Sequence, residues 1–550
     1  GVYHMWYHAD RDIGHATSTD GIHWTKDPDN PVLRPDSSPA AFDNFRVADP
    51  FVIKKDNIYY LYYAGEDRNG KSRIGLATSE LLPTPSPTPI PTATLTLTPS
   101  PSLFAPIILV PGFGASWNPR AFFSCDTGMT SGWKLAPYVS LYNRLIQTLT
   151  KNAQLQLNTD FYVYPYDFRQ PLDTQSILLK NFIDGILTSK PPGTRVRLIG
   201  HSFGGLVMRS YLSNNPFDHK AISALTIGTP HQGTVMVYPM WENGEIWTDN
   251  RLMQIALSQL IGHCRLKNTF ISRDQGKPKI NILTRRETVQ KFAPSIKNLL
   301  PLFDYLRENG NIKSTATLIH QNDWLSLHPF SSTFFGVNFS TLSGNNIETL
   351  RFLDVTHPSQ PEIRLGNWPD GKPVNKETTL LGDGSVLGLS SIITGTDNSI
   401  LAGSNHQDII SKKEAIEKIL AFLHLDGVSP ASPIPLPEET SSRFLTVALD
   451  VPAKLELTTP KKEIRESEDN ILVVFDQAPG MYTLRITPHA SGPAYLHLTL
   501  SENQQGISTK TYSVSLSQNK SIEYKIIYSR QTITIPRLIP LLSSNFSGSQ

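Results

Sequence analysis

The most specific chemical signal lies at residues 200–204, which read Gly-His-Ser-Phe-Gly. An apolar run at 196–199 precedes it, and a run with helical spacing of apolar residues follows at 205–212. A serine on a tight strand-to-helix turn needs small residues two positions away on each side, because larger side chains would collide with the turn. We therefore predict that Ser202 is a nucleophile and that Gly200 and Gly204 shape its elbow.

A serine hydroxyl is a weak nucleophile, so it needs a base, and the base needs a carboxylate that fixes its tautomer. Along the chain of a protein with such an elbow, the order is serine, acid, histidine. Asp383 follows an extended run and precedes a glycine, and His406 lies in a polar loop before a helix expected at 411–423. We predict Asp383 as the acid and His406 as the base.

Other residues of suitable type compete for these two roles: Asp397 and Asp408 as the acid, and His201, His231 and His320 as the base. Asp408 is expected to cap the following helix instead. His201 belongs to the elbow and should point away from the neighbouring hydroxyl, and His231 precedes the acid in the chain. Each competitor is therefore expected to be structural.

Acyl transfer also needs hydrogen-bond donors for the oxyanion that forms on the substrate carbonyl. These are normally the backbone N–H after the nucleophile and one from the loop after the first central strand. Residues 111–114 read Pro-Gly-Phe-Gly directly after an apolar run. The predicted oxyanion hole is therefore made by the N–H groups of Phe113 and Phe203.

These residues need a scaffold, and the apolar runs around them indicate one. Runs rich in β-branched residues alternate with helical patterns, at 106–110, 161–164, 196–199 and 222–227. Continuous apolar strands separated by helices predict a mainly parallel sheet with helices on both faces. The predicted fold of residues 104–427 is an α/β-hydrolase core.

Residues 104–427 resemble the lecithin:cholesterol acyltransferase and lysosomal phospholipase family of α/β-hydrolases. The matching stretches follow the family's order, at 107–114, 164–169, 198–205, 227–233 and 382–386, with His406. The resemblance implies transfer of a fatty acyl group from a lipid ester to water or an alcohol. The chain departs from the family at Phe203, where Met or Leu is common, and it lacks the paired nearby cysteines of the animal acyltransferases. Residues 122–138 are expected either to cover the pocket or to be core.

The first eighty residues contain a repeat. An aromatic strand pattern at residue 2 recurs at 58, and Gly-x-Ala-Thr-Ser at 14 recurs at 75, which gives offsets of 56 (58 minus 2) and 61 (75 minus 14). Aromatic strands at such a period predict a truncated β-propeller over residues 1–80. With Thr-Asp-Gly-Ile-His-Trp at 19–24 and Ala-Asp-Pro-Phe at 48–51, this segment resembles five-bladed propeller glycoside hydrolases. The resemblance implicates Asp49 in a sugar site, although Asp49 could instead cap a turn.

Two Pro-rich segments divide the rest of the chain. Residues 81–103 are rich in Pro, Thr and Ser and predict an extended spacer, and residues 428–442 predict a second linker. Alternating apolar and polar residues over 443–535 predict a β-sandwich domain, followed by a tail at 536–550.

Composition limits the classes of function. The chain has 550 residues, a net charge of +2 and no long basic run, which argues against nucleic acid as a partner. Its two cysteines, Cys125 and Cys264, cannot build a CxxC zinc site, and they could form one disulfide. No apolar run reaches 18 residues. The chain starts at Gly1 inside an expected strand, so we expect that a preceding segment, such as a signal peptide, is missing.

The sequence therefore predicts a serine esterase of lipid metabolism at the cell surface or outside the cell: a lipase, phospholipase or O-acyltransferase that needs no metal or cofactor. Its expected partner is an acyl-ester substrate, with carbohydrate contact through the flanking domains and peripheral contact with a lipid surface as further expectations. The alternative is a surface carbohydrate-binding or glycoside-active protein in which the hydrolase domain is accessory.

Overall fold

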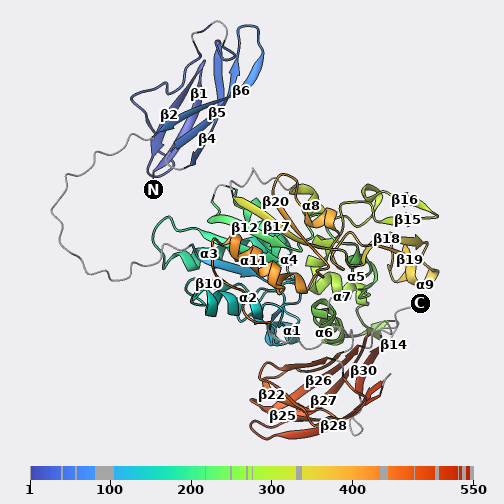
Figure 1. Cartoon of the computed structure of the whole chain (residues 1–550). Helices are drawn as coiled ribbons and strands as arrows, with labels where there is room; N and C mark the ends of the chain where they lie inside the picture. The colour runs from blue at the N-terminus through green and yellow to red at the C-terminus, as the bar shows by residue number, and fades with distance from the viewer. Residues whose placement is uncertain are drawn as a thin grey trace, which may run out of the picture. The chain divides into compact units, whose positions relative to one another are not determined.

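The computed structural model (Figure 1) describes residues 2–36, 38, 41–55, 58–80, 105–216, 218–247, 251–267, 270–274, 277–329, 337–433, 444–475, 477–501, 507–529, 532–534 and 540–545. The chain divides into two units, Gly1–Pro101 and Ser102–Gln550. The spacer expected at 81–103 lies outside the described residues, as does most of the linker expected at 428–442. No described helix is long and apolar enough to cross a membrane.

The first unit contains two antiparallel three-stranded sheets. One consists of β1 (Tyr3–Ala9), β2 (Asp12–Ser18) and β3 (Thr25–Lys26), and the other of β4 (Arg46–Lys55), β5 (Ile58–Glu66) and β6 (Ser72–Glu80). Ile13, Val47 and Leu61 belong to its small buried core. Antiparallel strands match the sequence pattern, and the propeller assignment stays a prediction.

The second unit is built around a six-stranded sheet in the order β10-β7-β11-β12-β17-β20, in which all neighbours are parallel. Its strands are β7 (Ile107–Val110), β10 (Phe161–Val163), β11 (Val196–His201), β12 (Ala221–Ile227), β17 (Asn338–Asn345) and β20 (Asp397–Ala402). Apolar side chains of α2 (Asn143–Gln147), α3 (Leu172–Leu187), α4 (Phe203–Asn214) and α11 (Lys413–Phe422) join the strands in one buried core. The predicted α/β core with a parallel sheet is confirmed.

A long insertion separates β12 from β17. It includes α5 (Tyr238–Asn243), α6 (Arg251–Lys267), the hairpin β13 (Phe270–Asp274) and β14 (Lys277–Asn281), α7 (Arg285–Phe292) and α8 (Asp323–Leu327). Its strands β15 (Leu306–Glu308) and β16 (Asn311–Lys313) join β18 (Thr349–Thr356) and β19 (Lys372–Thr379) in a separate four-stranded sheet. This second sheet has its own buried apolar cluster, beside the main core.

The C-terminal region forms two antiparallel five-stranded sheets, in the orders β24-β21-β26-β27-β30 and β23-β22-β25-β28-β29. They share a buried core to which β21 (Phe444–Leu449), β22 (Ala453–Thr458) and β25 (Gly480–Pro488) contribute alternate residues. β30 (Pro540–Asn545) pairs with β27 (Ile507–Leu516), so part of the expected tail at 536–550 is a strand. Apolar and polar residues do not alternate in this short segment, so its sequence does not predict a strand.

The C-terminal sheets pack directly against the α/β core, although the linker expected at 428–442 was predicted to divide the two domains. Phe444 and Ile471 belong to the same buried cluster as the parallel sheet. The indole N–H of Trp117 donates to the carbonyl of Asp469 at 2.9 Å, and the Gln259 amide donates to the Thr499 hydroxyl at 3.0 Å. A Pro-rich linker shows that the chain leaves one domain, but not whether the next domain folds back against it.

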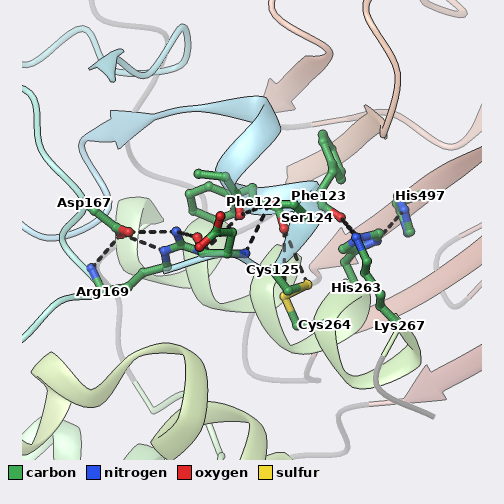
Figure 2. Close-up of a disulfide and its surroundings, with 12 residues drawn as sticks. Phe122, Phe123, Ser124, Cys125, Asp167, Arg169, His263, Cys264, Lys267 and His497 are labelled. Carbon is green, nitrogen blue, oxygen red and sulfur yellow. Dashed lines mark hydrogen bonds and ion pairs between the residues drawn. A yellow bond between two sulfur atoms is a disulfide. The ribbon is translucent and has the colours of Figure 1, made fainter. Parts of the chain in front are cut away.

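A disulfide and a buried histidine pair lie at this interface (Figure 2). Cys125, which ends α1 (Pro119–Ser124), is bonded to Cys264 on α6, 139 residues later. Next to it, His263 Nε2 donates to the Phe123 carbonyl at 2.7 Å, so its Nδ1 accepts the Nε2–H of His497 at 2.9 Å. His497 Nδ1 in turn accepts from the Thr511 hydroxyl at 2.9 Å. Every ring nitrogen is therefore satisfied with both histidines neutral.

The histidine pair should make stability depend on pH. Burial lowers the pKa of His263 to about 4, and burial together with His263 holds the pKa of His497 well below its usual value. An unfolded histidine titrates near pH 6.5, so below that pH the unfolded chain binds more protons and the free energy of unfolding falls. We expect a slope on the order of 1 kcal/mol per pH unit between about pH 6.5 and 4.5 in urea unfolding. His497→Gln should make this slope less steep, while the other buried histidines keep part of it, and His489→Gln, at an exposed histidine of the same region, should leave it unchanged. Equal slopes in both variants would contradict the assignment.

Candidate active site

Ser202 sits on a strained turn between β11 and α4, with φ 54° and ψ −126°. Non-glycine residues rarely adopt such backbone angles, and they persist only where the surroundings enforce them. The neighbouring glycines allow this turn: a Cβ on Gly200 would lie 2.7 Å from Gly205 Cα, and one on Gly204 would lie 2.2 Å from the Val110 carbonyl oxygen. A Cβ on the third glycine, Gly205, would lie 1.9 Å from Thr229 Oγ1.

The structure brings Ser202, His406 and Asp383 together. His406 Nε2 lies 2.8 Å from Ser202 Oγ, and His406 Nδ1 lies 2.8 Å from Asp383 Oδ2. The second carboxylate oxygen accepts the N–H groups of Ser385 at 3.0 Å and Val386 at 2.7 Å. Asp383 is 1% exposed and accepts these hydrogen bonds, so Nδ1 of His406 donates to its other oxygen and Nε2 accepts the serine hydroxyl. The arrangement can accept a proton from Ser202.

A buried polar chain connects the elbow to the loop that carries His406. Tyr142 Oη accepts the N–H of Gly112 at 2.8 Å and donates to His201 Nδ1 at 3.0 Å. His201 Nε2 then donates to the His406 carbonyl at 2.9 Å. Burial, with a smaller contribution from His406, lowers the pKa of His201 to about 3, so this ring stays neutral near neutral pH. No local sequence pattern indicates this role for Tyr142, which lies 59 residues before His201.

The loop after β7 lies against the nucleophile. A Cβ on Gly112 would be 3.0 Å from Ser202 Cβ, and the rings of Phe113 and Phe203 meet edge to face with centroids 6.0 Å apart. Within the described parts of the chain, neither the N–H of Phe113 nor that of Phe203 has a hydrogen-bond acceptor. Both groups are available to a ligand.

A small cavity opens at the triad. The space between its walls is about 270 Å³ when open solvent is counted, so this figure is not the volume of a closed chamber, and the walls are largely apolar. The lining residues are Phe113, Ser202, Phe203, Pro230, Thr234, Met236, Leu299, Ser385, Val386 and His406. Residues 122–138 are absent from this lining, and Phe122 and Phe123 are buried in the main core. Phe122 and Phe123 are therefore core residues, whereas Asp126, Gly128 and residues 130–132 of the same segment are exposed.

The competing acids lie elsewhere. Asp397 is exposed at the first position of β20. We expected Asp408 to cap α11, and this prediction was wrong. Asp408 starts a short 3₁₀ turn instead, and its carboxylate accepts a hydrogen bond from the Asn405 amide at 2.7 Å. The residue at the N-cap of α11 is Lys412, whose side chain forms no capping bond. Asn405 takes the local capping role instead, because its side-chain oxygen accepts the N–H of Asp408 at 2.8 Å.

The competing histidines also have other partners. His231 is buried, and its Nε2 lies 3.0 Å from the Thr226 hydroxyl. His320 Nδ1 lies 2.5 Å from a carboxylate oxygen of Glu242, in the insertion. In the first unit, Asp49 is exposed at a bulge of β4 with φ 51°, within the strand and not at its start.

Comparison with known proteins adds a domain assignment. Residues 105–243 match the PGAP1-like alpha/beta domain, a range that includes β7, the elbow and β12. The six-stranded parallel sheet and its helices fit an α/β-hydrolase core. No curated protein matches the chain.

Several solved structures are similar to this chain at low sequence identity. The mature lipase BlEst2 of Bacillus licheniformis is 14% identical, with 60% of this chain and 96% of that chain covered and a TM-score of 0.32. Phospholipase PlaB from Legionella pneumophila is 12% identical, with 81% and 99% covered and a TM-score of 0.31. A carboxylesterase structure from Nitrososphaera gargenis is 11% identical, with 68% and 98% covered and a TM-score of 0.27. Similarity this low does not establish an activity.

The elbow packing predicts the effect of adding one methyl group. Gly204→Ala should lower the free energy of unfolding by about 3 kcal/mol or more, because its Cβ would overlap backbone atoms that cannot move aside. Gly185→Ala is the matched control, since a Cβ on this exposed glycine of α3 would meet nothing within 4 Å. The control should be neutral or stabilising by up to about 1 kcal/mol in urea unfolding. Equal stabilities of the two variants would show that the turn is less tightly packed than described.

Proposed function

We propose that this chain is a serine esterase that releases the acyl group of an apolar, lipid-like ester through Ser202, His406 and Asp383. The observation that carries the proposal is the continuous hydrogen-bonded chain from Ser202 Oγ through the His406 ring to the Asp383 carboxylate, at 2.8 Å for each step. It lies beside an apolar cavity with two unpartnered backbone N–H groups at its edge.

The chemistry follows from these positions. His406 Nε2 takes the Ser202 proton while Oγ attacks the ester carbonyl carbon, and the imidazolium is stabilised by Asp383. The N–H groups of Phe113 and Phe203 stabilise the charge on the carbonyl oxygen. His406 then gives its proton to the leaving alcohol, which departs and leaves an acyl-Ser202 ester. Water, or another alcohol, loses a proton to His406, attacks this ester and restores the serine.

The cavity supports an apolar acyl group. Pro230, Met236, Leu299 and Val386 line it, and none of its described walls carries a charged group besides the His406 ring when that ring is protonated. Apolar walls favour an alkyl chain over a sugar or a charged acid. This agrees with the resemblance to the acyltransferase and phospholipase family, from which a fatty acyl donor is inferred.

We also propose that the chain works outside the cell or at the cell surface. The Cys125–Cys264 disulfide supports this, because disulfides persist mainly in oxidising compartments. The proposed location is tested by the redox state of the two cysteines in protein taken directly from its native cells.

Removal of the nucleophile should abolish turnover. In Ser202→Ala, kcat/KM for 4-nitrophenyl butyrate should fall by at least about 1,000-fold, because the attacking oxygen is lost while the fold is kept. Ser213→Ala, on the same helix α4, is the control and should retain activity. Melting curves of both variants should match the parent. Substantial turnover by folded Ser202→Ala would refute the mechanism.

The substrate class is tested by a series of 4-nitrophenyl esters from acetate to palmitate, assayed alongside a phospholipid and a triglyceride. We expect kcat/KM to rise from acetate to at least butyrate, because each buried methylene contributes about 0.8 kcal/mol, or roughly fourfold. Mass spectrometry of the products with and without added glycerol separates hydrolysis from transfer to an alcohol. A preference for acetate over all longer chains would contradict the lipid-like substrate.

A further inference from the structure

Three potential metal ligands converge in the insertion, outside the triad. Glu242 lies in α5, His320 in the segment before α8, and Asp370 in the segment before β19. One ligand atom of each residue lies within 4.8 Å of the others. The three residues are separated by 78 and 50 positions in the sequence, so the fold and not a local motif brings them together.

The cluster is buried and rich in negative charge. The Glu242 residue is 0% exposed and Asp370 is 2% exposed, while the side chain of His320 is 20% exposed. Two buried carboxylates are costly unless positive charge compensates them. Of the nearby basic residues, Arg286 lies 3.4 Å from His320 Nε2, and Lys313 donates to the backbone carbonyl of Asp370 at 3.0 Å. In the described contacts, neither pairs with a carboxylate of the cluster.

The backbone fixes the ligands in place. The two carboxylate oxygens of Asp370 accept the N–H groups of Ile319 at 2.7 Å and His320 at 2.9 Å, which orients the carboxylate and leaves lone pairs free. The Tyr238 hydroxyl of α5 donates to the Gly371 carbonyl at 2.6 Å, and the Trp368 N–H donates to the Glu242 carbonyl at 3.1 Å. Such hydrogen bonds around the ligands are the outer shell that metal sites require.

The donor set selects the metal. One imidazole nitrogen and two carboxylate oxygens suit Zn²⁺, whereas Ca²⁺ and Mg²⁺ take oxygen ligands. Zinc bonds of about 2.1 Å in a tetrahedron place ligand atoms roughly 3.4 Å apart. His320 Nδ1 and Glu242 Oε1 are 2.5 Å apart, so their distance would have to increase by about 1 Å when zinc binds. The His320 ring is partly exposed, and a small rotation of this ring allows the change.

We propose that Glu242, His320 and Asp370 bind one Zn²⁺ ion, with water at the fourth position. The ion would join α5 to the segment before β19. α5 follows the pocket residues Thr234 and Met236, and β19 leads to Asp383, so the ion would brace both flanks of the active site. Its role is therefore structural, and it takes no part in the ester chemistry.

The test uses the full chain stripped with EDTA, dialysed, and titrated with Zn²⁺ by calorimetry, with metal content measured by mass spectrometry. We expect about one Zn²⁺ per chain and a higher Tm when it is bound. His320→Asn should weaken binding by at least about 100-fold. His328→Asn, which changes another partly buried histidine of the insertion, should bind as the parent does. Unchanged binding in His320→Asn, or no stoichiometric binding in the parent, would overturn the proposal.

Two further measurements keep the proposal testable if His320→Asn does not fold. Co²⁺ bound to the stripped parent should give the visible absorption bands of a four-coordinate site, and Zn²⁺ should remove them. His406→Gln should keep the full stoichiometry, since the triad histidine is outside the site. Six-coordinate Co²⁺ spectra, preference for Ca²⁺ over Zn²⁺, or loss of binding in His406→Gln would each overturn it. Ester hydrolysis is assayed separately, so either proposal can fail alone.

Discussion

The backbone of Ser202, held at φ 54°, is the constraint on which the active site depends. The turn exists because β11 lies between β7 and β12 in a fixed parallel register and because α4 starts immediately after it. The helix can approach the strand ends only where Gly204 and Gly205 offer no side chain. The unfavourable backbone angles are therefore maintained by the packing of the parallel sheet and α4, and the hydroxyl faces His406 as a result.

The elbow also organises the loops around it. His201, inside the motif, bonds on one side to Tyr142 and on the other to the backbone of His406. Tyr142 holds Gly112 of the loop that carries Phe113. Because burial keeps His201 neutral, the direction of each hydrogen bond in this chain is fixed. The proposed nucleophile, base and oxyanion loop thus share one buried polar network.

Local signals predicted the centre of the fold. The strands at 106–110, 161–164, 196–199 and 222–227 appear within one or two residues of the predicted ends, since each is an apolar run with clear boundaries. Ser202 was recognisable from its glycines, and Asp383 and His406 from chain order. Asp383 nevertheless lies after a strand of the second sheet and not of the central one, and no pattern in the sequence indicated this second sheet.

Features that depend on contacts between distant segments could not be predicted. The Cys125–Cys264 bond spans 139 residues, and sequence left its formation open. Tyr142 is one of many tyrosines until the fold places it beside His201. The same holds for Glu242, His320 and Asp370, which share no motif, and for the packing of the C-terminal sheets against Trp117 and α6. In each case burial and charge identify the residues only after the chain has folded.

The central claim is that Ser202 is made nucleophilic by His406, and covalent labelling tests it most directly. The full chain is treated with a fluorophosphonate, digested, and analysed by peptide mass spectrometry, beside a His406→Gln variant. The account predicts one phosphonate adduct, on Ser202, which forms in the parent and at least about 100-fold more slowly in the variant, because the base is missing. An adduct on another residue, or labelling of Ser202 at the same rate in both proteins, would contradict it.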